Sequence, residues 1–145
     1  MATTTFLSNA TVNITQGATT VDISDQVKSA TITVGYDSLE TTAMGDTGRK
    51  YTQGLQSVSV SLECYLSYGG SGATSEIETL CADMVGQGDT TLVISPSGTT
   101  ESATNPEYTI TNAMLASFTP IASVVGELAM VTLQFDGGTW ARDIT

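Results

Sequence analysis

The chain has 145 residues, and its 15 Asp and Glu against four Lys and Arg leave a formal net charge of −11 at pH 7. This balance excludes the basic surface that a conventional nucleic-acid-binding protein needs to neutralise phosphates. The sequence contains no histidine, so the commonest general base and the commonest metal ligand are both missing, and we expect neither an enzyme nor a cofactor.

The length is that of a single domain, residues 1–145. Its first ten residues have no basic charge and no apolar stretch of signal-peptide length, so we expect residues 1–10 to be a flexible arm of a protein that stays in the cytoplasm. No apolar run approaches the roughly 20 residues of a membrane-spanning helix, and no membrane partner is expected.

Alternation of apolar and polar residues predicts strands along most of the chain. It is longest over residues 56–68, and a weaker repeat over 29–37 predicts the strand that pairs with it in a long hairpin. The apolar positions of the longer strand begin with Val58, Val60, Leu62 and Cys64, and the polar positions are Ser57, Ser59, Ser61 and Glu63. Further strands are predicted at 11–15, 21–23, 90–95, 108–118 and 128–135, with a turn over 136–138 after the last.

One helix is predicted over residues 75–85. Ser75 and Glu78 have the spacing of a capping box, and Gly86 supplies the stop. The apolar positions recur with helical spacing at Ile77, Leu80, Cys81, Met84 and Val85. The fold class is therefore mainly β: a sandwich or barrel of two antiparallel sheets with one flanking helix and a long hairpin.

Two cysteines, Cys64 and Cys81, occupy apolar positions of these elements. In a cytoplasmic chain without histidine they cannot complete a four-ligand zinc site, so we expect both to be reduced thiols in the core.

The stretch over residues 38–54 shows little periodicity and is longer than a structureless loop inside a compact domain usually is. Arg49 and Lys50 lie side by side within it and make up half of the cations of the chain. Two copies could dock if these charges met acidic residues of a neighbour. The alternative is a pair of solubilising charges on an exposed loop.

The tripeptide Asp46-Thr47-Gly48 in this stretch also matches the catalytic motif of dimeric aspartic proteases. In those enzymes the aspartate ends an apolar strand, so that two carboxylates share a proton in a dry interface. Residues 41–45 are loop sequence instead, which favours a turn capped by Asp46.

Trp140 and Arg142 follow the last predicted strand. Packing of Trp140 against the edge of the domain is one interpretation, and a subunit contact is the other, because Trp and Arg are enriched at interface hot spots.

The block from Ser29 to Leu66 resembles the tail tube (major tail) proteins of long-tailed, siphovirus-type bacteriophages. These proteins have a strand, a degenerate loop motif and then a long alternating strand. In this chain the motif residues are Thr41-Thr42, Gly45-Asp46, Arg49 with Tyr51, and Gly54-Leu55. The single helix after the hairpin and Gly126-Glu127-Leu128 before the last strand are also similar to that family.

The resemblance implies the phage tail-tube fold and homo-hexameric rings that stack into a hollow tube, with phage DNA passing through the lumen without specific binding. It implies further partners, namely the tape measure, terminator and distal tail proteins, and a place in the tail of a virion assembled in the host cytoplasm. The residues expected to face the lumen are Thr31, Thr33, Ser57, Ser59, Ser61 and Glu63. Those expected at contacts between subunits or rings are Thr41, Thr42, Gly45, Asp46, Arg49, Lys50, Tyr51, Gly54, Leu55, Trp140 and Arg142.

Two other functions fit the same sequence. Another ring protein of the tail, such as a terminator, distal tail or sheath protein, could have a related fold. A secreted β-sandwich module that binds carbohydrate or cells would also be acidic and rich in threonine, although such binders usually present clustered exposed aromatics and only 6% of this chain is aromatic.

Overall fold

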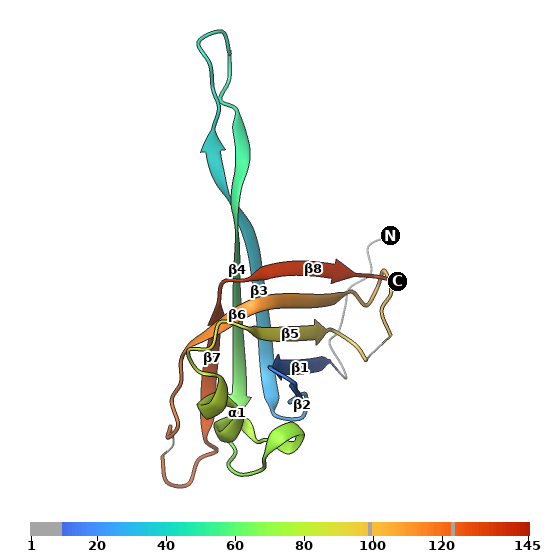
Figure 1. The fold of residues 1–145 in the computed structure, drawn as a ribbon, viewed down its shortest axis with the longest axis vertical. Helices are drawn as coiled ribbons and strands as arrows, with labels where there is room; N and C mark the ends of the chain where they lie inside the picture. The colour runs from blue at the N-terminus through green and yellow to red at the C-terminus, as the bar shows by residue number, and fades with distance from the viewer. Residues whose placement is uncertain (1–9, 99, 123) are drawn as a thin grey trace.

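A computed structural model describes residues 10–98, 100–122 and 124–145 (Figure 1). Of the predicted N-terminal arm, residues 1–9 lie outside the described residues. The strands are β1 (Thr11–Gln16), β2 (Thr19–Asp22), β3 (Val27–Glu40), β4 (Tyr51–Tyr65), β5 (Thr90–Ser95), β6 (Glu107–Ser117), β7 (Met130–Asp136) and β8 (Thr139–Asp143). A 3-10 turn η1 (Gly72–Thr74) and the helix α1 (Ile77–Met84) lie between β4 and β5.

The strands pair in the order β2-β1-β5-β6-β7-β4-β3, with β8 beside β6, and every pairing is antiparallel. β6 joins the two halves of this sheet: its first part pairs with β5 and β8, and its last part, from Met114, pairs with β7. Asn112, where the two parts meet, has a φ of 62°, a left-handed conformation that asparagine tolerates. The strands of one half therefore run across those of the other (Figure 1). The predicted mainly β fold with one helix is confirmed, but the two predicted sheets are halves of one continuous sheet, because β6 pairs in both.

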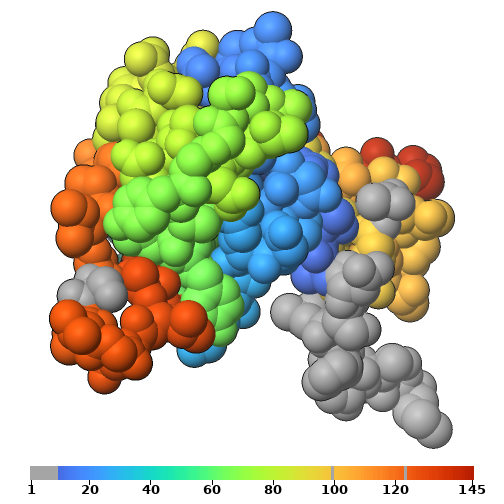
Figure 2. Space-filling view, turned by 90° about the horizontal axis from the view of Figure 1, so that it is seen from below, coloured from blue at the N-terminus to red at the C-terminus, as the bar shows by residue number. Residues whose placement is uncertain are grey.

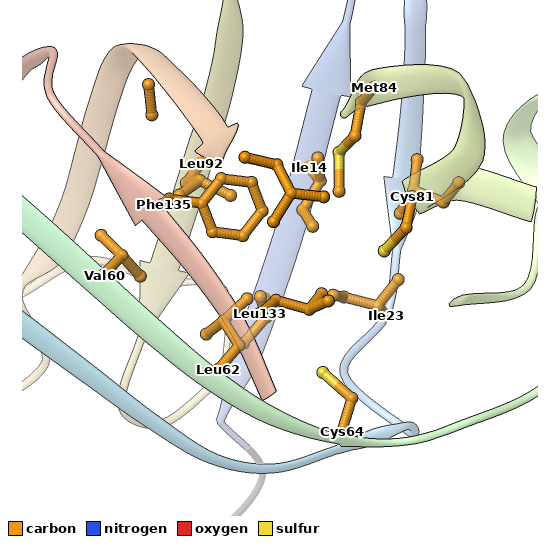
Figure 3. Close-up of a cluster of buried hydrophobic side chains, with 14 of the residues drawn as sticks. Ile14, Ile23, Val60, Leu62, Cys64, Cys81, Met84, Leu92, Leu133 and Phe135 are labelled. Carbon is orange, nitrogen blue, oxygen red and sulfur yellow. The ribbon is translucent and has the colours of Figure 1, made fainter. Parts of the chain in front are cut away.

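The helix α1 and the chain that leads into it cover one end of the molecule, which Figure 2 views directly. Above this end lies the core, where side chains of both sheet halves and of α1 converge (Figure 3). Val60, Leu62, Leu133 and Phe135 are fully buried there. Each such side chain stabilises the fold by about 1.5 to 3 kcal/mol, so α1 and the two halves hold one another in place.

The predicted capping box at the start of α1 is wrong. The helix begins at Ile77, and Glu76 at its N-cap makes no side-chain hydrogen bond. Ser75 instead donates to the carbonyl of Gly72 at 2.8 Å. The hydroxyl of Ser67, in the chain that follows β4, accepts the N–H of Ile77 at 3.2 Å, so a residue distant in sequence supplies the cap.

The apolar face of α1 matches the prediction except at one position. Its buried residues are Ile77, Leu80, Cys81 and Met84, whereas Val85 is exposed. Cys64 and Cys81 are free, buried thiols, as predicted. Burial is the main reason why the pKa of each rises to about 12.

The strands β3 and β4 form a hairpin that extends far beyond the body of the molecule (Figure 1). Pairing continues to Glu40 and Tyr51, so the predicted loop over 38–54 is too long, and residues 41–50 alone form the tip. An irregularity between Tyr36 and Ser38 shifts the register, which breaks the two-residue alternation that would have marked the outer part of the hairpin as strand.

The strand β8 was not predicted, and it places Trp140 and Arg142 in a strand at an edge of the sheet instead of after its last strand. Trp140 lies opposite Ile110, and Arg142 lies opposite Tyr108. The strand has five residues and no clear alternation, so its pairing with β6 could not be read from the sequence.

Candidate assembly surfaces

Polar side chains cover one face of β3, β4 and β7. Ser61 lies between Thr31 and Gln134, and the neighbouring Ser59 is likewise flanked by β3 and β7 residues. We call this surface the polar face, and its members are Thr31, Thr33, Ser57, Ser59, Ser61, Glu63, Thr132, Gln134 and Asp136. It contains all six residues predicted to line a lumen, and none of its members is buried.

A side-chain hydrogen bond joins β7 to β4 on the polar face, and another lies within β7. The amide of Gln134 donates to the hydroxyl of Ser59 at 2.6 Å and to a carboxylate oxygen of Asp136 at 3.2 Å. The two charged members, Glu63 and Asp136, are both acidic. Such a surface offers hydroxyls and negative charge and no cation that could hold a phosphate.

The contribution of β7 to the polar face was missed by sequence reasoning. Within the predicted strand 128–135, Thr132 and Gln134 alternate with the buried Val131, Leu133 and Phe135. The sequence therefore indicated a second strand with one polar side. It did not indicate that β7 pairs with β4, because that pairing joins segments distant in the chain.

The other face of the hairpin is apolar and becomes uncovered as the hairpin leaves the body. Val58 is buried, its partner Val34 on β3 is partly exposed, and Tyr36, the next β3 residue on this face, is 43% exposed. β3 is also the last strand of the sheet, with an edge that pairs with no other described strand. A two-stranded ribbon is marginally stable alone and an open edge can pair with another chain, so we expect a partner to cover the hairpin.

The tip of the hairpin is an ordered turn. Asp46 accepts the N–H of Ala43 at 2.7 Å and donates its own N–H to the carbonyl of Ala43 at 3.0 Å. The ammonium of Lys50 lies 2.6 Å from a carboxylate oxygen of Asp46, and Thr42 accepts the N–H of Lys50 at 2.9 Å. These contacts, all between residues 42 and 50, hold the tip in one conformation.

These contacts confirm the turn interpretation of Asp46. The nearby ammonium of Lys50, followed by the N–H of Ala43, lowers the pKa of Asp46. In a protease dyad, the neighbouring carboxylate would instead raise the pKa of one of the two aspartates.

The two basic residues of the tip differ in their ion pairs, because Lys50 is paired with Asp46. Arg49 is exposed and makes no ion pair with any residue that the structure describes. Met44, in the same turn, is fully exposed. The predicted contact residues gathered on the tip and the outer strands are Thr41, Thr42, Gly45, Asp46, Arg49, Lys50, Tyr51, Gly54 and Leu55.

The structure does not bring Trp140 and Arg142 to this tip. β8 lies on the body of the molecule (Figure 1), where Trp140 is half-buried and its ring centroid lies 6.3 Å from that of Tyr108. This position agrees with packing against the edge of the domain.

Carboxylates meet where β6 and β8 pair. Glu107 lies directly opposite Asp143, and burial raises the pKa of Glu107, with further contributions from a hydrogen bond with Glu101 and from the charges of Glu101 and Asp143. Across the described part of the chain, no three His, Cys, Asp or Glu residues are placed to hold a metal ion.

A cavity of about 660 Å³ opens at the base of β3. Its walls include Val12, Val27, Ile32, Ile94 and Tyr108. The cavity adjoins the open edge of β3, so apolar surface that no other described residue covers continues from the hairpin into the body. None of the helices formed by the described residues is long and apolar enough to span a membrane.

No family model matches the sequence, and no curated protein matches it. Solved structures do match. A chain of the sheath/tube terminator of the PVC extracellular contractile injection system has a TM-score of 0.68 at 13% identity, over 98% of this chain and 98% of that chain. The tube-terminating cap of the anti-feeding prophage has a TM-score of 0.63 at 13% identity, over 100% and 95%.

A chain of the PVC sheath-tube complex is similar at a TM-score of 0.63 and 14% identity, over 94% of this chain and 89% of that chain. The chain shares its fold with these tube and terminator proteins. The fold expected from the tail-tube resemblance is therefore shown. None of these three structures is a siphovirus tail, so the siphovirus type rests on the sequence resemblance.

Proposed function

We propose that this chain is a structural tail protein whose copies form hexameric rings that stack into the hollow tube of a siphovirus-type phage tail. The observation that carries the proposal is that the hairpin has two different surfaces on its opposite faces. One is a polar face continuous over β3, β4 and β7, and the other is an exposed apolar surface beside an open strand edge. The similarity of fold to tube proteins over 94% of the chain supports it.

In this arrangement the polar face lines the lumen and phage DNA passes along it. Each chain has a net charge of −11, and Glu63 and Asp136 place negative charge on the face itself. A wall of hydroxyls and carboxylates repels phosphate and leaves no cation at which the DNA would stall. The acidity of the chain thus favours passage of DNA without binding.

The contacts between copies are made by the hairpin. Its open β3 edge and apolar face meet neighbours in the ring, and the tip contacts an adjacent ring, while Trp140 and Arg142 take part from the body. The tape measure, terminator and distal tail proteins are the further partners, within a virion assembled in the host cytoplasm.

A terminator is the second candidate, because two of the matched structures are a terminator and a terminating cap and both cover nearly the whole chain. A subunit that ends a tube needs to dock on it through one end only. In this chain exposed apolar side chains lie both on the hairpin tip, at Met44, and at the opposite end, at Val125, which favours a subunit that stacks on both sides.

The experiment is negative-stain electron microscopy and size-exclusion chromatography of the purified protein at increasing concentration. Hollow tubes longer than one ring are the expected result. Rings that never lengthen would assign the chain to the terminators, and a monomer at every concentration would contradict both functions.

A further inference from the structure

The chain between β6 and β7 lies at the opposite end of the molecule from the hairpin tip (Figure 1). Figure 2 views that end and shows this segment in orange at its margin, next to the green chain that follows β4. Two hydrogen bonds hold the segment there. Tyr68 donates its hydroxyl to the carbonyl of Pro120 at 2.8 Å, and Leu66 donates its N–H to the carbonyl of Ala129 at 2.9 Å.

This segment presents apolar side chains to solvent. Val125 is fully exposed, and Ile121 and Leu128 are each 79% exposed. We define the basal patch as Ile121, Val125, Glu127 and Leu128. Exposed apolar side chains that gather at one site mark an interaction surface.

The hairpin tip presents a second surface of the same kind. We define the tip patch as Leu39, Met44, Arg49, Tyr51 and Leu55, all of which are exposed. Leu39 lies opposite Thr52 and Tyr51 lies opposite Glu40, so the side chains of Leu39 and Tyr51 are on the two faces of the ribbon and the patch surrounds the tip.

The charges of the two patches are complementary. The tip patch carries Arg49, which has no ion-pair partner among the described residues. Of the acids next to it, Asp46 is paired with Lys50 and Glu40 lies opposite Tyr51. The basal patch carries Glu127, and the nearby α1 adds Glu78 and Asp83, while neither the segment nor α1 contains a cation. Opposite charges would fix the register of an otherwise apolar contact.

We propose that the tip patch of one copy docks on the basal patch of the next copy along the tube, with Arg49 facing Glu127. This inference rests on the proposed tube and adds the partner surface of the hairpin tip. The two patches lie at opposite ends of one chain, so the tip cannot reach its own basal patch and the contact is head-to-tail. Such heterologous contacts produce open-ended assemblies.

A charge exchange tests the pairing. Arg49→Glu and Glu127→Arg, each alone, place like charges together and are expected to raise the critical concentration for tube formation about tenfold, and the double variant is expected to return it near the wild-type value. The matched control combines Arg49→Glu with Asp89→Arg. This control has the same net charge as the first double variant, but its new arginine lies in the turn before β5 and not in the basal patch. No rescue is expected from this control, and equal rescue by both pairs would overturn the proposal.

Cysteine cross-linking tests the contact directly. Met44→Cys and Val125→Cys variants, mixed and assembled before mild oxidation, are expected to form a mixed disulfide dimer, whereas Met44→Cys mixed with Ala18→Cys is not. The native Cys64 and Cys81 do not interfere, since both are buried and their pKa values are about 12.

The outcomes separate this inference from the proposed function. Tubes that form normally without the mixed disulfide, and that tolerate Arg49→Glu, would overturn the docking of the tip on the basal patch and leave the tube intact. Wild-type protein that forms no tube under any condition would overturn both.

Discussion

Replacing Val60 by Asp tests the division of β4 into a core face and a polar face. Val60 is fully buried and lies between Ile32 of β3 and Phe135 of β7. Ser59, the preceding residue, points to the polar face, where it accepts a hydrogen bond from Gln134. Adjacent residues of one strand should therefore respond to the same substitution in opposite ways.

The magnitudes follow from burial. Val60→Asp loses about 1.5 to 3 kcal/mol of apolar burial and adds a desolvation cost of several kcal/mol for an unpaired carboxylate. Together these approach the total stability of about 5 to 15 kcal/mol of a typical domain, so we expect the variant to be unfolded at pH 7. Val60→Ala removes the apolar contribution alone and should cost about 2 kcal/mol.

The assay is urea unfolding of unassembled protein, followed by circular dichroism. Ser59→Asp is the matched control and should remain within about 1 kcal/mol of the wild type, the scale of a like-charge pair beside Asp136. The reasoning would be refuted by a Val60→Asp protein with the wild-type midpoint, or by a Ser59→Asp protein that unfolds as readily as Val60→Asp.

Three further predictions concern the polar face, a carboxylate pair and the hairpin. Ser59→Lys should permit tubes but slow DNA exit from phage particles, because it adds a cation to the lumen; unaltered release kinetics would argue against the face assignment. The folded state binds the proton of Glu107 more tightly than the unfolded state does, since its pKa is raised from 4.5, so its contribution to stability is lost as the pH rises through the folded pKa. Glu107→Gln should therefore raise the free energy of unfolding at pH 7 by a few tenths of a kcal/mol and flatten its pH dependence, and a lower free energy of unfolding at pH 7 would be inconsistent with an unfavourable carboxylate at this site, near Glu101 and Asp143. Gly54→Val should impair assembly and leave the unfolding midpoint of the body unchanged, because a Cβ at Gly54 would lie 3.0 Å from that of Asp37 in the hairpin; wild-type tube yield would disprove it.

The parts of the fold that were predictable depend on local periodicity. The alternation along β4 identified Val58, Val60, Leu62 and Cys64 as core because side chains of a strand point to opposite faces in turn. The buried face of α1 was predictable for the same kind of reason. The residues of the tip were also identifiable as a turn from Gly and Asp.

The parts that were missed depend on pairing between distant segments. The cap of α1 comes from Ser67 instead of Ser75, the polar ladder of β7 joins the polar face only through its register with β4, and Trp140 enters the sheet because β6 has a free side for β8. The basal patch was missed as well. Its apolar side chains have no strand or helix period, and only their exposure in the folded chain distinguishes them from core residues.

A cryo-EM reconstruction of the assembled protein tests the central claim most directly, because it shows which side of the hairpin the pore uses. We predict a hollow tube whose inner wall carries Thr33, Ser59 and Asp136. A tube with these side chains on its outer surface, or a preparation that contains only separate monomers, would contradict the account.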